Sequence, residues 1–243
     1  MEDNKVQVRV VGSGSMWNAH NSASYMIDED ILVDIPNGLC KYLFRLGIDL
    51  CSINNVLITH FHGDHYFDLP FYFILKSRAE NKIINVFCSK KGKIKNNKLL
   101  KLAFPNSAKE IKTAVNLTYS HDIDFCINDY QVSKISMNHG KNMPDDGYIF
   151  TKDDIKVGFT GDTTLCKNVE YMASVCNYLF CDCMFIEGTN KHMGIDMIKE
   201  LSSTYHNCNF VVSHMEDNTR EELKKMDIKN VIVPEDGAII DIK

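Results

Sequence analysis

The sequence lacks any apolar run near the roughly 18 residues that a membrane-spanning helix needs. Its opening segment, MEDNKVQVRVVGSGS, is acidic and then strand-like, and it does not have the pattern of a secretory signal peptide. The formal net charge of −5 gives no general attraction to nucleic acids or to acidic membranes. We therefore expect a cytoplasmic protein with no membrane partner.

A disulfide framework and an interdomain linker are also missing. The nine cysteines are an odd number scattered along the chain, and without a secretory signal they are predicted to be reduced thiols. Cys181 and Cys183 lie two apart, so in a strand they would share one face, which we expect to be in the core. No tract rich in proline, glycine or serine divides the 243 residues. We expect a single domain over residues 1–243.

Strand and helix patterns alternate along this chain. Two strand-rich halves with interspersed helices favour two sheets packed together and covered by helices, an α/β fold. Predicted strands cover residues 6–14, 24–28, 30–35, 55–59, 83–88, 131–138, 147–152, 156–162, 181–188, 209–214 and 230–235. Predicted helices cover residues 38–48, 69–80, 96–104, 194–205 and 219–226.

The segment VLITHFHGDHY, residues 56–66, places four metal-capable side chains where a strand ends. They cannot all share a helix face, because residues two apart on a helix point away from each other. On a loop, His60 and His62 can converge on one metal ion while Asp64 and His65 turn toward a neighbouring one. Imidazole and carboxylate ligands suit zinc, with manganese or iron as alternatives.

Three further polar residues stand just past predicted strands. His139 ends VSKISMNHG, Asp162 follows KVGFTG, and His214 ends NFVVSH. Together with the first motif they provide five histidines and two aspartates, which favours a metal site. The segment GSGSMW, residues 12–17, lacks the third glycine of a dinucleotide loop, so we interpret it as a turn that lines this pocket.

The sequence resembles the metallo-β-lactamase superfamily, and within it the ribonuclease-Z-like branch. HFHGDH matches the H-x-H-x-D-H motif, and GDT and SHM match the downstream ligand motifs. The resemblance runs from VVGSGS to PEDGAIIDI and implies a four-layer αββα sandwich, and a homodimer is expected from it as well. It also implies two zinc ions, one held by His60, His62 and His139, the other by Asp64, His65 and His214, with Asp162 bridging both.

Hydrolysis by a metal-bridging hydroxide follows from such a site, because paired zinc ions lower the pKa of bound water and clamp an in-line displacement. Asp64 could orient the hydroxide or accept its proton. A leaving alkoxide needs a proton, and His192 in EGTNKHMG is the candidate acid, since the branch has a catalytic histidine in a comparable place. Glu187 could orient His192.

The substrate is predicted from the spacing of the ligands. Ribonuclease Z carries a tRNA-gripping arm between the third histidine ligand and the bridging aspartate, whereas residues 140–161 here have room only for two short strands and a turn. We expect a phosphodiesterase acting on a small phosphodiester such as a cyclic nucleotide, with nucleic acid disfavoured as a partner. A tRNA 3′ endoribonuclease is the first alternative, and a carboxylic ester, lactone or thioester hydrolase is the second. The lysine cluster that could serve the first alternative comprises Lys90, Lys91, Lys93, Lys95, Lys98 and Lys101.

Overall fold

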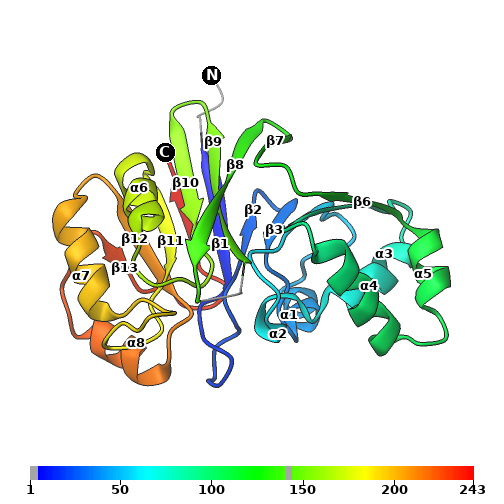
Figure 1. The fold of residues 1–243 in the computed structure, drawn as a ribbon, viewed down its shortest axis with the longest axis horizontal. Coiled ribbons are helices and arrows are strands. Elements are labelled where there is room, and N and C mark those ends of the chain that lie inside the picture. Colours follow the sequence, from blue (N-terminus) through cyan, green and yellow to red (C-terminus); the bar gives the residue numbers. More distant parts are fainter. Residues whose placement is uncertain (1–4, 141–143) are drawn as a thin grey trace.

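Strand β1 (Val6–Gly12) shows in its burial pattern how the sheets pack. Val6, Val8 and Val10 alternate with the less buried Gln7 and Arg9, so these apolar side chains face one way, into a core that both sheets share. The computed structural model describes residues 5–140 and 144–243 and contains two seven-stranded sheets packed against each other (Figure 1).

The first sheet is mixed. Strands β3 to β6 run parallel, while β1, β2 and β14 pair antiparallel. Its order is β14 (Ile239–Ile242), β1, β2 (Ser24–Ile27), β3 (Ile31–Val33), β4 (Asn55–Leu57), β5 (Ile83–Phe87) and β6 (Asn116–Ser120).

The second sheet is also mixed. Strands β7 to β10 pair antiparallel, and β10 to β13 run parallel. Its order is β13 (Val231–Ile232), β12 (Asn209–Ser213), β11 (Tyr178–Asp182), β10 (Ile155–Phe159), β9 (Pro144–Lys152), β8 (Tyr130–Asn138) and β7 (Asp124–Ile127).

Helices cover the outer face of each sheet, which gives four layers (Figure 1). One apolar cluster lies between the two sheets. A second lies between the first sheet and its helices, and a third between the second sheet and its helices. The first sheet carries α1 (Leu39–Arg45), α2 (Gly63–Tyr66), α3 (Leu69–Arg78), α4 (Gly92–Ala103) and α5 (Ala108–Ala114). The second carries α6 (Lys167–Val175), α7 (Ile195–Thr204) and α8 (Asp217–Lys224). The predicted αββα sandwich is confirmed.

The predicted strand over 181–188 is wrong in its boundaries. Strand β11 begins at Tyr178 and ends at Asp182, and the remainder of the predicted segment lies outside the regular strands. Cys181 and Cys183 are buried, as expected, in the core beneath the helices of the second sheet. None of the helices among the described residues is long and apolar enough to cross a membrane.

Strand direction explains why distant motifs can meet. Strands β8 and β10 both pair antiparallel with β9, so they run the same way and their carboxyl ends lie at one edge of the sheet. Strands β11 and β12 run parallel to β10 and end there too. The predicted ligands that follow β8, β10 and β12 therefore come together, opposite the end of β4 in the first sheet.

Candidate metal centre

The first ligand motif leaves the carboxyl end of β4. His60 and His62 lie in the connecting segment, and Asp64 and His65 lie on the single turn of α2. Gly161 makes room opposite them, because a Cβ atom there would come within 2.8 Å of Thr59, and its φ of 63° is a conformation that favours glycine.

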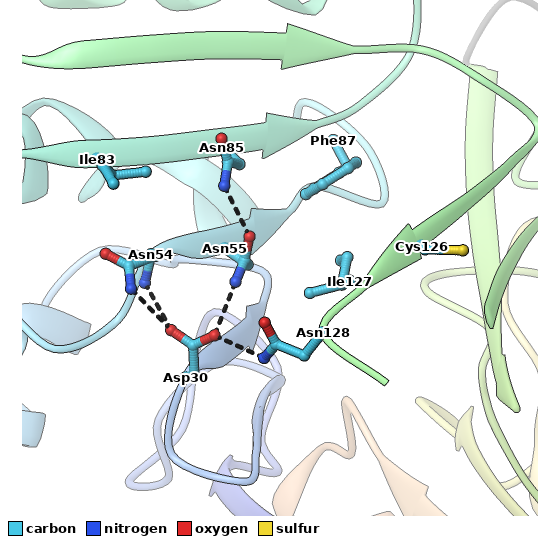
Figure 2. A pocket seen from close by; sticks show the side chains of 9 residues that line it. All are labelled: Asp30, Asn54, Asn55, Ile83, Asn85, Phe87, Cys126, Ile127 and Asn128. Atoms are coloured by element: carbon cyan, nitrogen blue, oxygen red, sulfur yellow. Dashed lines mark hydrogen bonds between the residues drawn. The ribbon is translucent and has the colours of Figure 1, made fainter. Parts of the chain in front are cut away.

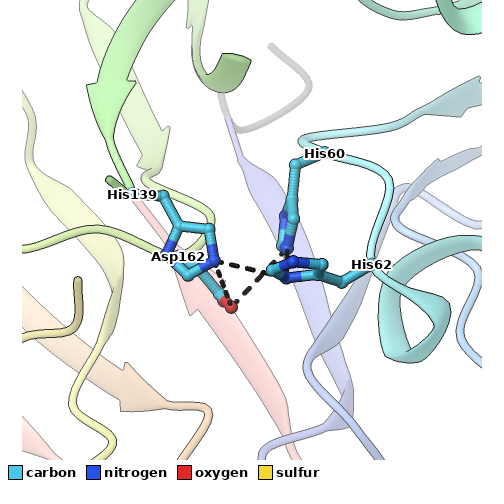
Figure 3. Close-up of side chains that lie close together, drawn as sticks. All are labelled: His60, His62, His139 and Asp162. Carbon is cyan, nitrogen blue, oxygen red and sulfur yellow. Dashed lines mark hydrogen bonds and ion pairs between the residues drawn. The ribbon is translucent and has the colours of Figure 1, made fainter. Parts of the chain in front are cut away.

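Three histidines from two sheets form the first group of the site. The Nε2 atom of His60 lies 2.9 Å from Nδ1 of His62, and Nε2 of His139 lies 3.3 Å from that same Nδ1 (Figure 3). These nitrogens and a carboxylate oxygen of Asp162 all lie within 4.8 Å of one another. His139 is held from behind, with its Nδ1 3.1 Å from the carbonyl oxygen of Lys191.

Asp64, His65 and His214 form the second group, and their ligand atoms also lie within 4.8 Å of one another. The Nε2 atom of His214 is 3.5 Å from Oδ2 of Asp64, and Nε2 of His65 is 3.8 Å from the same oxygen. His214 has a φ of 58°, and such a backbone conformation in a residue other than glycine is often found at functional sites.

Asp162 lies between the two groups. Its Oδ2 is 3.7 Å from Nε2 of His60 and 3.9 Å from Nε2 of His139, which belong to the first group. Its Oδ1 is 3.3 Å from Nε2 of His65, and its Oδ2 is 3.5 Å from Nε2 of His214, both in the second group. This is the position that a bridging ligand requires.

Asp34, which directly follows strand β3, supports ligands of both groups. Its carboxylate accepts hydrogen bonds from the backbone N–H and the hydroxyl of Thr59, each at 2.8 Å, and from Nδ1 of His65 at 2.8 Å. The Thr59 oxygen in turn lies 3.1 Å from Nδ1 of His60. Carboxylates of this kind fix the tautomer and the orientation of metal-binding imidazoles.

The charges of the site favour neutral imidazoles in one group and an ionised carboxylate between the groups. Burial lowers the pKa of His60 well below its ordinary value, and it lowers those of His62 and His139 as well. Burial opposes ionisation of Asp162, but the surrounding His214, His65 and His60 hold its pKa well below the usual range. A neutral imidazole and an ionised carboxylate are the forms that bind metals.

An unpaired nitrogen tests whether a metal ion fits this site. Because Nδ1 of His65 is engaged by Asp34, its Nε2 presents a lone pair in the neutral form, and that atom has no hydrogen-bond partner among the described residues. It faces carboxylate oxygens of Asp162 and Asp64. Lone pairs directed at one another need a cation between them. The histidine and aspartate cluster therefore fits divalent metal ions.

His192 is brought to the same site, and Asp182 orients it. Its Nδ1 lies 2.8 Å from Oδ2 of Asp182, a buried carboxylate that also accepts hydrogen bonds from the N–H groups of Thr163 and Met184, each at 3.0 Å. The predicted partner Glu187 is exposed instead. With Nδ1 engaged, Nε2 is the nitrogen of His192 left for another molecule.

A cavity of about 320 Å³ opens onto these side chains. Lys191 is the one lysine or arginine among the described residues that line it. The lining residues are Met16, His62, Asp64, His139, Gly140, Asp162, Met184, Lys191, His192 and His214. The predicted contribution of the turn at residues 12–17 to the pocket is thus observed through Met16.

Two other cavities contain none of the predicted ligands. A larger apolar groove of about 1000 Å³ lies over α1 and α3. Another, of about 470 Å³, surrounds Asp30, whose carboxylate accepts hydrogen bonds from Asn54, Asn55 and Asn128 (Figure 2). Asn55 also accepts a hydrogen bond from Asn85 of the neighbouring strand. These hydrogen bonds tie the segments that carry Asp30, Asn55 and Asn85 to one another.

The lysine cluster lies on and just before α4, and one of its members, Lys95, packs over an aromatic ring. The ammonium of Lys95 stands 4.7 Å from the ring centre of Phe61, the residue between His60 and His62. Burial lowers the pKa of Lys95. The side chains of Lys93 and Lys98 are exposed, as expected for a solvated helix face.

Sequence reasoning missed three buried carboxylates around the site. Asp34 directly follows strand β3 and Asp182 ends strand β11, and a polar residue at the end of a strand is the signal that identified the other residues. Asp182 stands between Cys181 and Cys183 at the end of β11, so in an extended chain it faces the side opposite those core residues. Asp145 is fully buried with no hydrogen-bond partner among the described residues, and its Oδ2 lies 3.5 Å from Nδ1 of His60.

Comparison with known proteins gives one family match and several relatives. The model of the family described as "Anti-Pycsar protein Apyc1" matches residues 6–235. A ribonuclease Z of Methanococcus maripaludis is 30% identical over 121 residues, which are 48% of this chain and 33% of that protein. The chain thus matches about a third of the length of that curated relative.

Solved structures share the fold at low identity. The metallo-β-lactamase fold protein YhfI from Bacillus subtilis superposes with a TM-score of 0.79 at 16% identity, over 98% of this chain and 100% of its own. A diphosphatase from the PhnP family superposes with a TM-score of 0.77 at 17% identity, over 98% of both chains. These structures share the fold, and together with the family match and the ribonuclease Z relatives they confirm the predicted superfamily and its ribonuclease-Z-like branch, whose members include metal-dependent hydrolases.

Proposed function

Because the chain belongs to the family of the anti-Pycsar protein Apyc1, within the metallo-β-lactamase superfamily, we propose that it is a dinuclear zinc phosphodiesterase. Its substrate in this proposal is a small phosphodiester, specifically a cyclic nucleotide. The observation that carries the proposal is the position of Asp162 between two groups of three ligand side chains each. Manganese or iron in place of zinc would suit the same ligands.

Two bound divalent ions would supply a hydroxide nucleophile at neutral pH and neutralise charge on the phosphate. The first ion would be held by His60, His62 and His139, the second by Asp64, His65 and His214, and both by Asp162. Asp34 keeps the imidazoles in the tautomer that this requires.

The remaining residues of the cavity handle the substrate. His192, held by Asp182, donates a proton from Nε2 to the leaving alkoxide. Lys191 places a positive charge at the cavity wall, where it attracts the anionic phosphodiester. Asp64 lines the cavity as well, so in addition to binding metal it orients the attacking water.

The size of the cavity and the strands beside it favour a small substrate. At about 320 Å³ the cavity is at the lower end of the range for small-molecule sites. Between His139 and Asp162, residues 144–159 form β9, β10 and their turn, all within the second sheet, while residues 141–143 lie outside the described residues. The described part of the segment therefore contains no protruding arm.

A substrate panel tests the proposal. Zinc-reconstituted protein should contain close to two metal ions per chain by elemental analysis and should hydrolyse 3′,5′-cyclic nucleotides. The same preparation is offered precursor tRNA with a 3′ extension, bis-p-nitrophenyl phosphate and a nitrophenyl carboxylic ester. Efficient cleavage of the tRNA would replace the proposal by a ribonuclease Z activity, which the identity to that relative favours as the second candidate. Turnover of the carboxylic ester alone would move the enzyme to another hydrolase class.

The sequence and the family resemblance also support a proposal for assembly, location and domain organisation. We propose a cytoplasmic homodimer in which residues 1–243 form one hydrolase domain. Sedimentation velocity over a range of protein concentrations measures the assembly, and a mass that stays at one chain would contradict it.

A further inference from the structure

The loop between β1 and β2 contains the chain's single tryptophan, Trp17, next in the sequence to a residue that lines the metal-binding cavity. Trp17 is 86% exposed, and its neighbour Met16 lines the metal-binding cavity. In Figure 1 this loop, drawn in blue, extends past the ends of the strands at the lower edge of the molecule. Tryptophan is the side chain that gains most from contact with a planar ligand, and here nothing in the described chain covers it.

The loop is anchored at its base, so the exposure of Trp17 is not a result of poor attachment. Asp236 accepts hydrogen bonds from the backbone N–H and hydroxyl of Ser13 at 3.1 and 2.8 Å. Its other oxygen accepts from the backbone N–H and side-chain amide of Asn21 at 2.7 and 3.1 Å. The N–H of Met215 donates to the carbonyl of Ser13 at 3.2 Å, which ties the loop to the residue that follows His214.

The predicted metal ligands and Met16 line the same cavity, and Trp17 lies next to Met16 on the loop, outside that lining. Hydrolysis requires the phosphate of a bound nucleotide to lie at the predicted ligands, so the sugar and base must extend along the other lining residues. Met16 contributes an apolar, partly exposed surface among them. An aromatic ring that lies against a nucleobase gives a stacking contact that tolerates different bases.

We infer that Trp17 is a stacking platform for the nucleobase of the substrate, and this inference rests on the proposed phosphodiesterase function. It names the substrate class as a nucleotide with an intact base. The recognition is by the face of the base, so it adds affinity for nucleotides over base-free phosphodiesters.

Kinetics of Trp17→Ala and Trp17→Phe test this inference in the metal-loaded protein. The substrates are a 3′,5′-cyclic nucleotide and the corresponding methyl ribofuranoside 3′,5′-cyclic phosphate, which has no base. Alanine should raise KM for the cyclic nucleotide by roughly tenfold or more relative to the base-free compound, the loss typical of a removed stacking ring. Trp17→Phe should keep KM for the cyclic nucleotide close to the wild-type value, because phenylalanine retains an aromatic ring. Phe44→Ala is the matched control, because Phe44 is 78% exposed and lines the groove over α1 and α3.

Fluorescence gives a reading that does not depend on turnover. In a His192→Ala background, the cyclic nucleotide should quench the emission of Trp17, the only tryptophan, and the base-free compound should not. Quenching in this variant, combined with no hydrolysis of any phosphodiester by the wild-type protein, would refute the proposed function and keep the stacking inference. Hydrolysis with no quenching, or an equal change of KM for both compounds, overturns the inference. A Trp17→Ala variant that sediments at half the mass of the wild type would assign the side chain to a second copy instead.

Discussion

Replacement of His192 by alanine separates proton donation from metal binding. Its Nδ1 is 2.8 Å from Asp182, and that same nitrogen is 4.0 Å from Asp162, so the ring is held by a carboxylate outside the two ligand groups. The side chain reaches the cavity wall. Removal should therefore leave both metal ions bound while it deprives the leaving group of its proton.

The expected loss of turnover in His192→Ala follows from the rate enhancement that a positioned general acid usually gives. General acid catalysis contributes about 10²–10⁴-fold, or roughly 2.7–5.4 kcal/mol of barrier at about 1.36 kcal/mol per factor of ten. The carboxylate of Asp182 is buried and accepts three hydrogen bonds from His192, Thr163 and Met184, so the ring is well fixed. We expect the full loss with a cyclic nucleotide, whose leaving group is an alkoxide.

Nitrophenolate leaves as a stable anion and needs no proton. Turnover of bis-p-nitrophenyl phosphate by His192→Ala should consequently fall far less than turnover of the cyclic nucleotide. The assay compares kcat for both substrates at equal metal content, measured by elemental analysis. His206→Ala, which removes an exposed histidine outside the cavity lining, is the control and should leave both values unchanged.

Two outcomes would refute the reasoning. Equal losses with both substrates would indicate that His192 positions the phosphate, and loss of metal would make it a ligand. Asp182→Asn extends the test, because an amide can place an N–H opposite Nδ1 of His192 and so favours the wrong tautomer. It should reproduce the dependence on the leaving group with a smaller loss.

Asp162→Ala should lose tightly bound metal and reduce phosphodiester turnover by orders of magnitude, since it removes the carboxylate that lies within 4 Å of imidazole nitrogens of both ligand groups; a fully active variant that keeps two metal ions would show that the bridge is misassigned. Zinc affinity should fall as the pH falls, because Asp162 and Asp34 outweigh the effect of burial and raise the pKa of His65 well above its ordinary value, so metal binding must displace its proton. Calorimetry in buffers of different ionisation enthalpy measures that proton, and pH-independent affinity would contradict the assignment. Glutamine at Lys93, Lys98 and Lys101 together should leave turnover of small substrates nearly unchanged, because exposed lysines act mainly through long-range attraction; salt-sensitive tRNA cleavage that disappears in this variant would favour the ribonuclease.

The ligand motifs could be found in the sequence because each depends on local order. A strand that ends in a cluster such as HFHGDH places metal-capable side chains at a sheet edge, and the same rule identified His139, Asp162 and His214. The four-layer fold was predictable for a related reason, since alternating strands and helices bury their apolar faces in only a few arrangements.

Tertiary structure alone decided which side chains support those ligands. Helix α1 and strand β4 separate Asp34 from His65 in the sequence, yet the two side chains lie 2.8 Å apart, because parallel pairing of β3 with β4 brings the ends of the two strands together. Asp182 replaced the expected Glu187 as the partner of His192 for the same reason: β11 ends at the site, whereas Glu187 lies beyond it and is exposed. Local sequence patterns specify where a strand ends, but strand pairing and packing of the two sheets determine which strand ends meet.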